Sequence, residues 1–158
     1  MSRKVLVLAL ALSLIAVIGA SALTAAIGAE FGFNGLGNGL PGSSALISFR
    51  LPKVPVVFGL GGTLSGGPSS LAILADWWLA KGPLFSFLNY YVGPGLFADL
   101  GSDGAYAGIR VPVGVNAFPL KPLEVFLELA PSFTIITPDA IDFGWSGFQT
   151  GFGFRFWF

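Results

Sequence analysis

The sequence ends on Phe148-Gln-Thr-Gly-Phe-Gly-Phe-Arg-Phe-Trp-Phe158, and this stretch decides what kind of fold can hold the chain. One parity carries aromatic side chains, while the other carries Gln149, Gly151, Gly153 and Arg155. Because a strand sends successive side chains to opposite faces, the stretch predicts a strand with one aromatic face. Its length fits the roughly 9–11 tilted residues with which a strand crosses a bilayer. Closure into a barrel in lipid would satisfy its backbone and remove an aggregation-prone edge.

The overall composition agrees with a chain of many short strands. Of the 158 residues, 54% are hydrophobic and only 10% are charged, and the chain contains 23 Gly and 16 Phe. An ordinary soluble domain has about a quarter of its residues charged. A run of about 20 apolar residues, as a membrane helix needs, occurs only at the N-terminus. Elsewhere the hydrophobic residues form short stretches separated by Gly and Pro, which favours one all-β domain.

Two residue types are missing, and their absence excludes several chemistries. The chain has no Cys and no His. Disulfides and cysteine-ligated metals are therefore excluded, and so are zinc sites of the common kind and Ser-His-Asp hydrolysis. We expect a protein that is not an enzyme and that needs neither a cofactor nor a metal.

Residues 1–22 are predicted to be a secretory signal peptide, which leaves residues 23–158 as the barrel domain. Arg3 and Lys4 precede an apolar run over 5–18, and Ala20-Ser-Ala22 fits a cleavage site. An uncleaved membrane anchor is the alternative. Loss of the leader leaves six basic and eight acidic residues, so no basic surface for nucleic acid is expected.

Eight segments after the leader have strand character: 26–34, 45–51, 56–65, 70–79, 84–98, 105–116, 123–135 and 148–158. Residues 71–80 also fit a short helix, and Gly93-Pro-Gly95 predicts a bulge or bend. Turns are expected at Lys81-Gly-Pro83, at Phe118-Pro-Leu-Lys-Pro122 and over 137–142. Eight strands with both ends on one side predict an antiparallel up-and-down transmembrane β-barrel, the smallest common size of membrane barrel.

The charged residues of these segments share the face opposite the aliphatic one. This face carries four acids and three bases, namely Glu30, Arg50, Asp76, Arg110, Glu124, Glu128 and Arg155. In so narrow a barrel they are expected to point inward and to form an interior network of ion pairs that plugs the lumen.

The connections show a second charge pattern. Lys53, Lys81 and Lys121 fall in the three turns expected on the same rim as the chain ends. Four acids, Asp99, Asp103, Asp139 and Asp142, fall in or beside the last two turns of the opposite rim. This sorting supports a count of eight strands, since one strand more or fewer would mix the two rims.

Two motifs that suggest chemistry have simpler explanations. Gly37-Asn-Gly-Leu-Pro-Gly42 matches a dinucleotide fingerprint, but the segment after it alternates like a strand rather than a helix, so the glycines are expected to be loop hinges. Glu124 and Glu128, with Asp76, are candidates for acid/base work. Residues four apart in a strand lie about 13 Å apart along it, so structural pairing with arginines is favoured.

The larger aromatic residues near the predicted strand ends suggest a membrane-interface girdle. They are Trp77, Trp78, Tyr90, Tyr91 and Trp157. A ligand-stacking site is the alternative. The connections on the outer side are short, with 34–39 the longest candidate, which limits the binding surface that they could form.

Three stretches carry a family resemblance: Gly108-Ile-Arg-Val-Pro-Val-Gly114, Pro122-Leu-Glu-Val-Phe-Leu-Glu-Leu-Ala-Pro131 and Gly151-Phe-Gly-Phe-Arg-Phe-Trp-Phe158. They resemble a family of small, largely uncharacterised outer-membrane barrels best represented in spirochaetes. The whole mature chain is more broadly similar to the eight-stranded outer-membrane protein A and X class. The resemblance implies that Phe154, Phe156 and Phe158 form the signal read by the barrel assembly machinery. It also implies outer-membrane lipid and an envelope or host protein as partners, although the chain lacks the long loops of adhesive members.

The sequence therefore predicts a monomeric barrel of the bacterial outer membrane with a structural or surface-interaction role. Three alternatives stay open: a narrow, porin-like pore or small-ligand carrier, a lipid-modifying barrel enzyme, and a soluble lipocalin-like barrel with an apolar ligand inside. The last differs in parity, because its aliphatic face would point inward and its charged face outward.

Overall fold

The chain folds into an antiparallel β-sheet that closes on itself. The computed structural model describes residues 25–36, 42–51, 54–65 and 69–158. Within these ranges it contains strands and turns and no helix. In chain order the strands are β1 (Ala26–Leu36), β2 (Gly42–Arg50), β3 (Val56–Ser65), β4 (Ser70–Trp77), β5 (Ala80–Pro83), β6 (Leu88–Val92), β7 (Gly95–Gly101), β8 (Gly104–Arg110), β9 (Val113–Leu120), β10 (Leu123–Ile136) and β11 (Ile141–Trp157).

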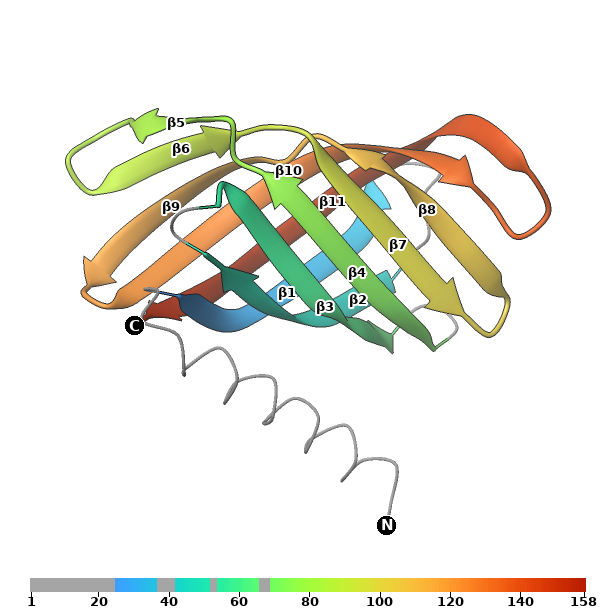
Figure 1. Ribbon diagram of the computed structural model, residues 1–158, viewed down its shortest axis with the longest axis horizontal. Coiled ribbons are helices and arrows are strands. Elements are labelled where there is room, and N and C mark those ends of the chain that lie inside the picture. The colour runs from blue at the N-terminus through green and yellow to red at the C-terminus, as the bar shows by residue number, and fades with distance from the viewer. Residues whose placement is uncertain (1–24, 37–41, 52–53, 66–68) are drawn as a thin grey trace, which may run out of the picture.

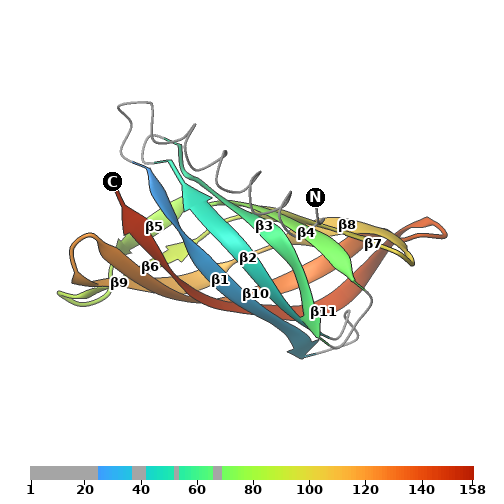
Figure 2. The ribbon, with the colours of Figure 1, turned by 90° about the horizontal axis from the view of Figure 1, so that it is seen from below.

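Eight of these strands form the closed ring, in the order β1-β2-β3-β4-β7-β8-β10-β11, and β11 pairs back with β1. The seam runs from the pair Ala26 and Trp157 to the pair Leu36 and Phe148. The C-terminal stretch thus lies beside the first strand of the domain, on the side of the barrel seen in Figure 2 (compare Figure 1). The predicted all-β, eight-stranded antiparallel up-and-down barrel is confirmed.

Three of the long strands are each divided by a bend, which is why eleven segments form eight strands. The bends separate β4 from β5, β6 from β7 and β8 from β9. They lie side by side, because backbone hydrogen bonds run from Trp77 N to Pro94 O (2.9 Å), from Gly93 N to Pro112 O (3.3 Å) and from Val111 N to Pro131 O (2.9 Å). Proline has no N–H to offer the ladder, so a row of prolines interrupts the sheet across adjacent strands. The bend predicted at Gly93-Pro-Gly95 is one of these.

The two ends of the barrel differ. The terminal rim is defined here as the end that carries Arg50, Val56 and Trp157, and the far rim as the end that carries the turns at 102–103 and 137–140. The β5–β6 hairpin projects beyond the barrel at the terminal rim and the β10–β11 hairpin at the far rim, at the left and right of Figure 1. Both hairpins expose apolar side chains, among them Phe85 (66% exposed) and Phe143 (63%).

Several predicted turns and boundaries are wrong. Lys81-Gly-Pro83 lies in β5 rather than in a turn. The chain reverses over residues 84–87 (Leu-Phe-Ser-Phe), where Leu84 N and Phe85 N both donate to Leu88 O (2.8 and 3.1 Å). Residues 118–120 belong to β9, and the last strand begins at Ile141 instead of Phe148. Residues 71–77 form a strand, so the helical alternative is excluded there. These segments have the polar or Pro-containing composition of turns, but they continue the strands because a neighbouring strand pairs with them.

Some predictions fall on residues outside the described ranges. The predicted signal peptide, the cleavage site and Lys53 are among them, and so are residues 37–41 of the Gly-rich motif, whose last residue, Gly42, begins β2. These stay predictions.

Candidate functional site: the charged interior

The inner and outer faces of the barrel have opposite character. All seven predicted interior charges are buried, and none is more than 7% exposed. The alternate positions of the same strands are exposed and apolar, with Leu127 at 59%, Leu96 at 49% and Phe152 at 46%. The pattern follows from the two-residue period of a strand, since one register sends every charge to the same face.

Arg110 of β8 is the centre of the first interior cluster. Its Nε lies 3.2 Å from Asp76 Oδ1 of β4, its Nη2 bonds Glu128 Oε1 of β10, and its Nη1 donates to Gln149 Oε1 of β11 (2.9 Å). Tyr91 of β6 donates its hydroxyl to the other Glu128 oxygen (2.9 Å). One guanidinium on β8 thus contacts side chains of three other strands of the ring, β4, β10 and β11.

A second cluster surrounds Glu124 nearer the terminal rim. Asn116 Nδ2 donates to Glu124 Oε1 (2.6 Å), and Trp157 Nε1 donates to Oε2 (2.9 Å). Arg155 Nη1 lies 3.8 Å from the same Oε2, while Arg155 Nε donates to Ser48 Oγ (2.9 Å). The guanidinium carbon of Arg155 also lies 3.8 Å from the ring centroid of Phe126, a cation–π contact.

Arg50 and Glu30 are the two predicted charges without an ion pair between described residues. The guanidinium carbon of Arg50 lies 4.1 Å from the ring centroid of Trp78 and 5.4 Å from that of Trp157. Glu30 is 5% exposed, and the positive charges of Arg110 and Arg155 act on its carboxylate.

The prediction of a membrane-interface girdle is wrong for Trp78 and Tyr91, which lie inside the barrel. Trp78 and Tyr91 are 2% and 0% exposed, and their rings stack inside the barrel at 3.7 Å between centroids. Trp157 directs its indole N–H inward to Glu124. The alternation of side chains along the strand already indicates an inward Trp78, since Trp78 shares the face of Asp76. Nearness to a strand end does not distinguish an inward from an outward side chain.

Gly114 of β9 makes room for Tyr91, because a Cβ at this position would overlap the ring and hydroxyl of Tyr91. We expect Gly114→Val to lower the free energy of unfolding by about 1–3 kcal/mol through overpacking and displacement of Tyr91 from Glu128. The measurement is denaturant unfolding in detergent micelles or vesicles. Gly144→Val is the matched control, since a Cβ there would have no atom within 4 Å. Equal tolerance of both changes would contradict this role of Gly114.

The carboxylates considered for acid/base work are held by interior donors. Glu124 accepts from Asn116 and Trp157, and Glu128 accepts from Tyr91 and pairs with Arg110. Among the residues that the structure describes, no three Asp, Glu, His or Cys side chains group in a way that could hold a metal ion.

The three residues of the predicted assembly signal lie on the outer face. Phe154, Phe156 and Phe158 are 40%, 42% and 71% exposed. Phe154 and Phe156 belong to β11 and pair with Ala29 and Ile27 across the seam, and the Phe158 N–H donates to Ala25 O (2.9 Å). The C-terminus is thus held against the beginning of the barrel.

The charged residues of the two rims have opposite signs. Lys81 and Lys121 are exposed near the terminal rim, and Asp103 and Asp139 are exposed at the far rim, where Asp99 accepts from Ser70 (2.8 Å).

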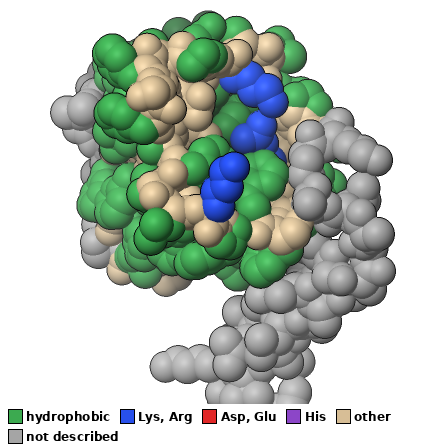
Figure 3. Space-filling view, turned by 90° about the vertical axis from the view of Figure 1, so that its left-hand side faces the viewer, with side chains coloured by type: hydrophobic (Ala, Val, Ile, Leu, Met, Phe, Trp, Pro, Cys, Tyr) green, Lys and Arg blue, Asp and Glu red, His purple; other side chains and the backbone are tan. Residues whose placement is uncertain are grey.

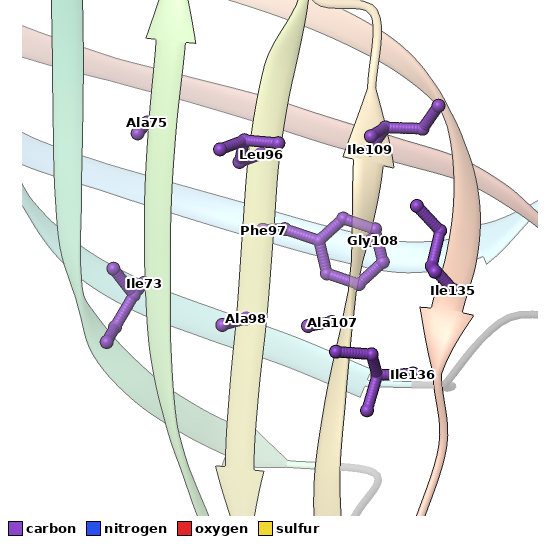
Figure 4. A pocket seen from close by; sticks show the side chains of 10 residues that line it. All are labelled: Ile73, Ala75, Leu96, Phe97, Ala98, Ala107, Gly108, Ile109, Ile135 and Ile136. Carbon is purple, nitrogen blue, oxygen red and sulfur yellow. The ribbon is translucent and has the colours of Figure 1, made fainter. Parts of the chain in front are cut away.

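An open groove of about 420 Å³ crosses the outside of β4, β7, β8 and β10 (Figure 4). Its lining residues are Ile73, Ala75, Leu96, Phe97, Ala98, Ala107, Gly108, Ile109, Ile135 and Ile136.

Comparisons with known proteins leave the family open. No protein-family model matches the chain, and no curated protein is detectably similar to it in sequence. In the part of the chain that the structure covers, no helix has the length and apolarity needed to span a membrane.

Proposed function

We propose that this protein is an integral β-barrel of a bacterial outer membrane, with a plugged polar interior and a structural or surface-interaction role. The observation that carries the proposal is the inverted distribution of side chains: ionised groups such as Arg155 (1% exposed) lie inside, while Leu127 and Phe152 face outward. Charged groups buried in pairs and a continuous apolar exterior suit a barrel whose solvent is lipid.

Two alternatives fit the interior less well. A narrow pore needs a continuous water path, whereas Arg110, Glu128 and the stacked rings of Trp78 and Tyr91 occupy the lumen. A soluble lipocalin-like barrel would hold an apolar ligand on an apolar inner face and expose its charges to water. Here the inner face carries the seven charges, which favours the membrane proposal.

The resemblance of the C-terminal stretch extends the proposal to assembly. Phe154, Phe156 and Phe158 would be the residues that the barrel assembly machinery recognises before β11 pairs with β1. Their outward direction supports this role, because it leaves the three aromatic side chains accessible on the outer face. A monomer is proposed, with outer-membrane lipid as its immediate surroundings.

Trp77 and Trp78 provide a test, since they are neighbours in the sequence and lie on opposite faces. Trp78 is 2% exposed inside the barrel, and Trp77 shares the outward parity of Ile73. We would prepare two variants that each keep one of these tryptophans, with Phe at the other three positions, and reconstitute them in vesicles of lipids brominated near the headgroup end of the acyl chains. The Trp77 fluorescence is expected to be quenched more than that of Trp78.

The outcome separates the alternatives. Unquenched fluorescence in both variants would place the barrel outside the membrane, and equal quenching would contradict the assignment of inner and outer faces. Boiled and unboiled samples on a detergent gel serve as the folding control, because only folded barrels change mobility on heating.

A further inference from the structure

Arg50 is an interior arginine that contacts aromatic rings and has no ion pair among the described residues. It is the last residue of β2 and is 7% exposed at the terminal rim. Arg110 and Arg155 both pair with carboxylates, but no salt bridge to Arg50 exists among the described residues. The Arg50 Nε is buried and has no hydrogen-bond partner in the part of the chain that the structure describes. Leaving a buried charged donor unpaired is costly, so such a group needs an explanation.

Trp78 supplies a second unmatched donor at the same place. Its Nε1 is also buried, and no described residue accepts a hydrogen bond from it. Its ring lies under the Arg50 guanidinium, 4.1 Å from centroid to carbon, so the two donors belong to one site. Both are 93% buried or more, and neither is offered an acceptor by the surrounding described side chains.

The surrounding charge at this end is positive. Glu124, the carboxylate that acts electrostatically on Arg50, already accepts from Asn116 and Trp157 and lies beside Arg155. Lys81 and Lys121 are exposed near the same rim. Figure 3 looks onto this end, and the charged side chains visible there are basic, with no acidic one in view. The exposed acids that the structure describes lie at the far rim, so the field favours an anion at the terminal rim.

We propose that the terminal mouth of the barrel binds a small oxyanion, a phosphate or carboxylate group, at the edge of the stacked Arg50 and Trp78 side chains. The planar guanidinium presents parallel donors that match two oxygens of such a group, and the indole N–H supplies a further donor. Binding of an anion is an activity beyond the structural role proposed above. Because the site lies inside the barrel, it does not depend on whether the outer face contacts lipid.

Equilibrium dialysis with radiolabelled inorganic phosphate, at constant ionic strength and in a non-ionic detergent, tests the site in the full folded chain. Saturable binding of one phosphate per chain is expected. Arg50→Gln should weaken it at least about tenfold, and Trp78→Phe, which keeps the ring and removes the N–H, about three- to tenfold. Lys81→Gln is the control for a surface cation of the same end and should change the affinity less than about twofold.

Competition identifies the source of the oxyanion. Displacement of phosphate by acetate would indicate a general carboxylate or phosphate site, and stronger displacement by a short-chain phosphatidylglycerol would indicate a lipid headgroup. Gel mobility checks the fold of each variant. If Arg50→Gln does not fold, Arg50→Lys replaces it, since it keeps the charge and removes the paired donors, and weaker binding is again expected.

Two results would overturn the proposal. One is the absence of saturable phosphate binding to the wild-type chain. The other is an affinity that stays unchanged in Trp78→Phe and in Arg50→Gln, or in Arg50→Lys where it replaces Arg50→Gln. A loss of affinity in Lys81→Gln alone would then assign the binding to surface lysines.

Discussion

Replacing Arg110 with methionine is expected to lower the free energy of unfolding by about 3–5 kcal/mol, the largest effect of any single change considered for this chain. Arg110 contacts Asp76, Glu128 and Gln149 from three other strands of the ring and is 3% exposed. Its removal leaves two carboxylates buried without their main cation. Chemical unfolding of the reconstituted barrel, followed by gel mobility or tryptophan fluorescence, measures the loss.

The partners of Arg110 provide an internal check. Arg110→Met combined with Glu128→Gln should lose less stability than the two single changes added together, because the second change removes one stranded charge. Lys121→Met is the matched control, since Lys121 is an exposed cation in a turn and its loss should stay within about 0.5 kcal/mol. A loss of less than about 1 kcal/mol for Arg110→Met would contradict the interior network as the element that joins these strands.

Leu127→Arg is the substitution with the second largest expected effect. Its cost shows whether lipid or water surrounds the outer face of the barrel. Leu127 of β10 is 59% exposed and pairs with Phe152, which in turn pairs with Phe31 midway along β1. If this face lies in the apolar layer, an arginine there should cost roughly 2–4 kcal/mol. In water the same exposed position should tolerate the change within about 0.5 kcal/mol.

Leu120→Arg is the control for that substitution. Leu120 is 74% exposed at the end of β9, beside Lys121 at the terminal rim. Near a membrane interface the same leucine-to-arginine change should cost only about 0–1 kcal/mol. Unfolding in vesicles, run in parallel for the two variants, gives the difference, and equal small losses would argue against a lipid-covered face.

The barrel itself was predictable from the sequence because strand periodicity is local. One parity of each segment is apolar and the other holds the charges, so the inner position of Glu124 and Arg155 requires only the two-residue period. The pairing of β11 with β1 was predictable because an unpaired terminal strand would be an aggregation-prone edge.

The partners within the interior were not predictable in the same way. Asp76, Arg110 and Glu128 lie on β4, β8 and β10 and meet only when these strands pair with a particular stagger, which nothing in the local pattern sets. The row of prolines at 94, 112 and 131 also acts between strands, since its members come together through cross-strand hydrogen bonds. Tyr91 is inside because Gly114 of the neighbouring strand leaves space for its ring.

The misplaced turns have a related cause. Lys81-Gly-Pro83 has the composition of a turn, yet it pairs with β6, and the reversal occurs over the largely apolar residues 84–87. Turn chemistry indicates where a chain can reverse, whereas the length of the neighbouring strand decides where it does.

The membrane location is tested most directly by fractionation of cells that express the full chain, in a bacterium with two membranes. Membranes are separated on a density gradient, washed with urea and compared with and without boiling on a detergent gel. The proposed function predicts a band in the outer-membrane fraction that resists the wash and migrates faster unboiled. A soluble protein with no change in mobility would contradict it.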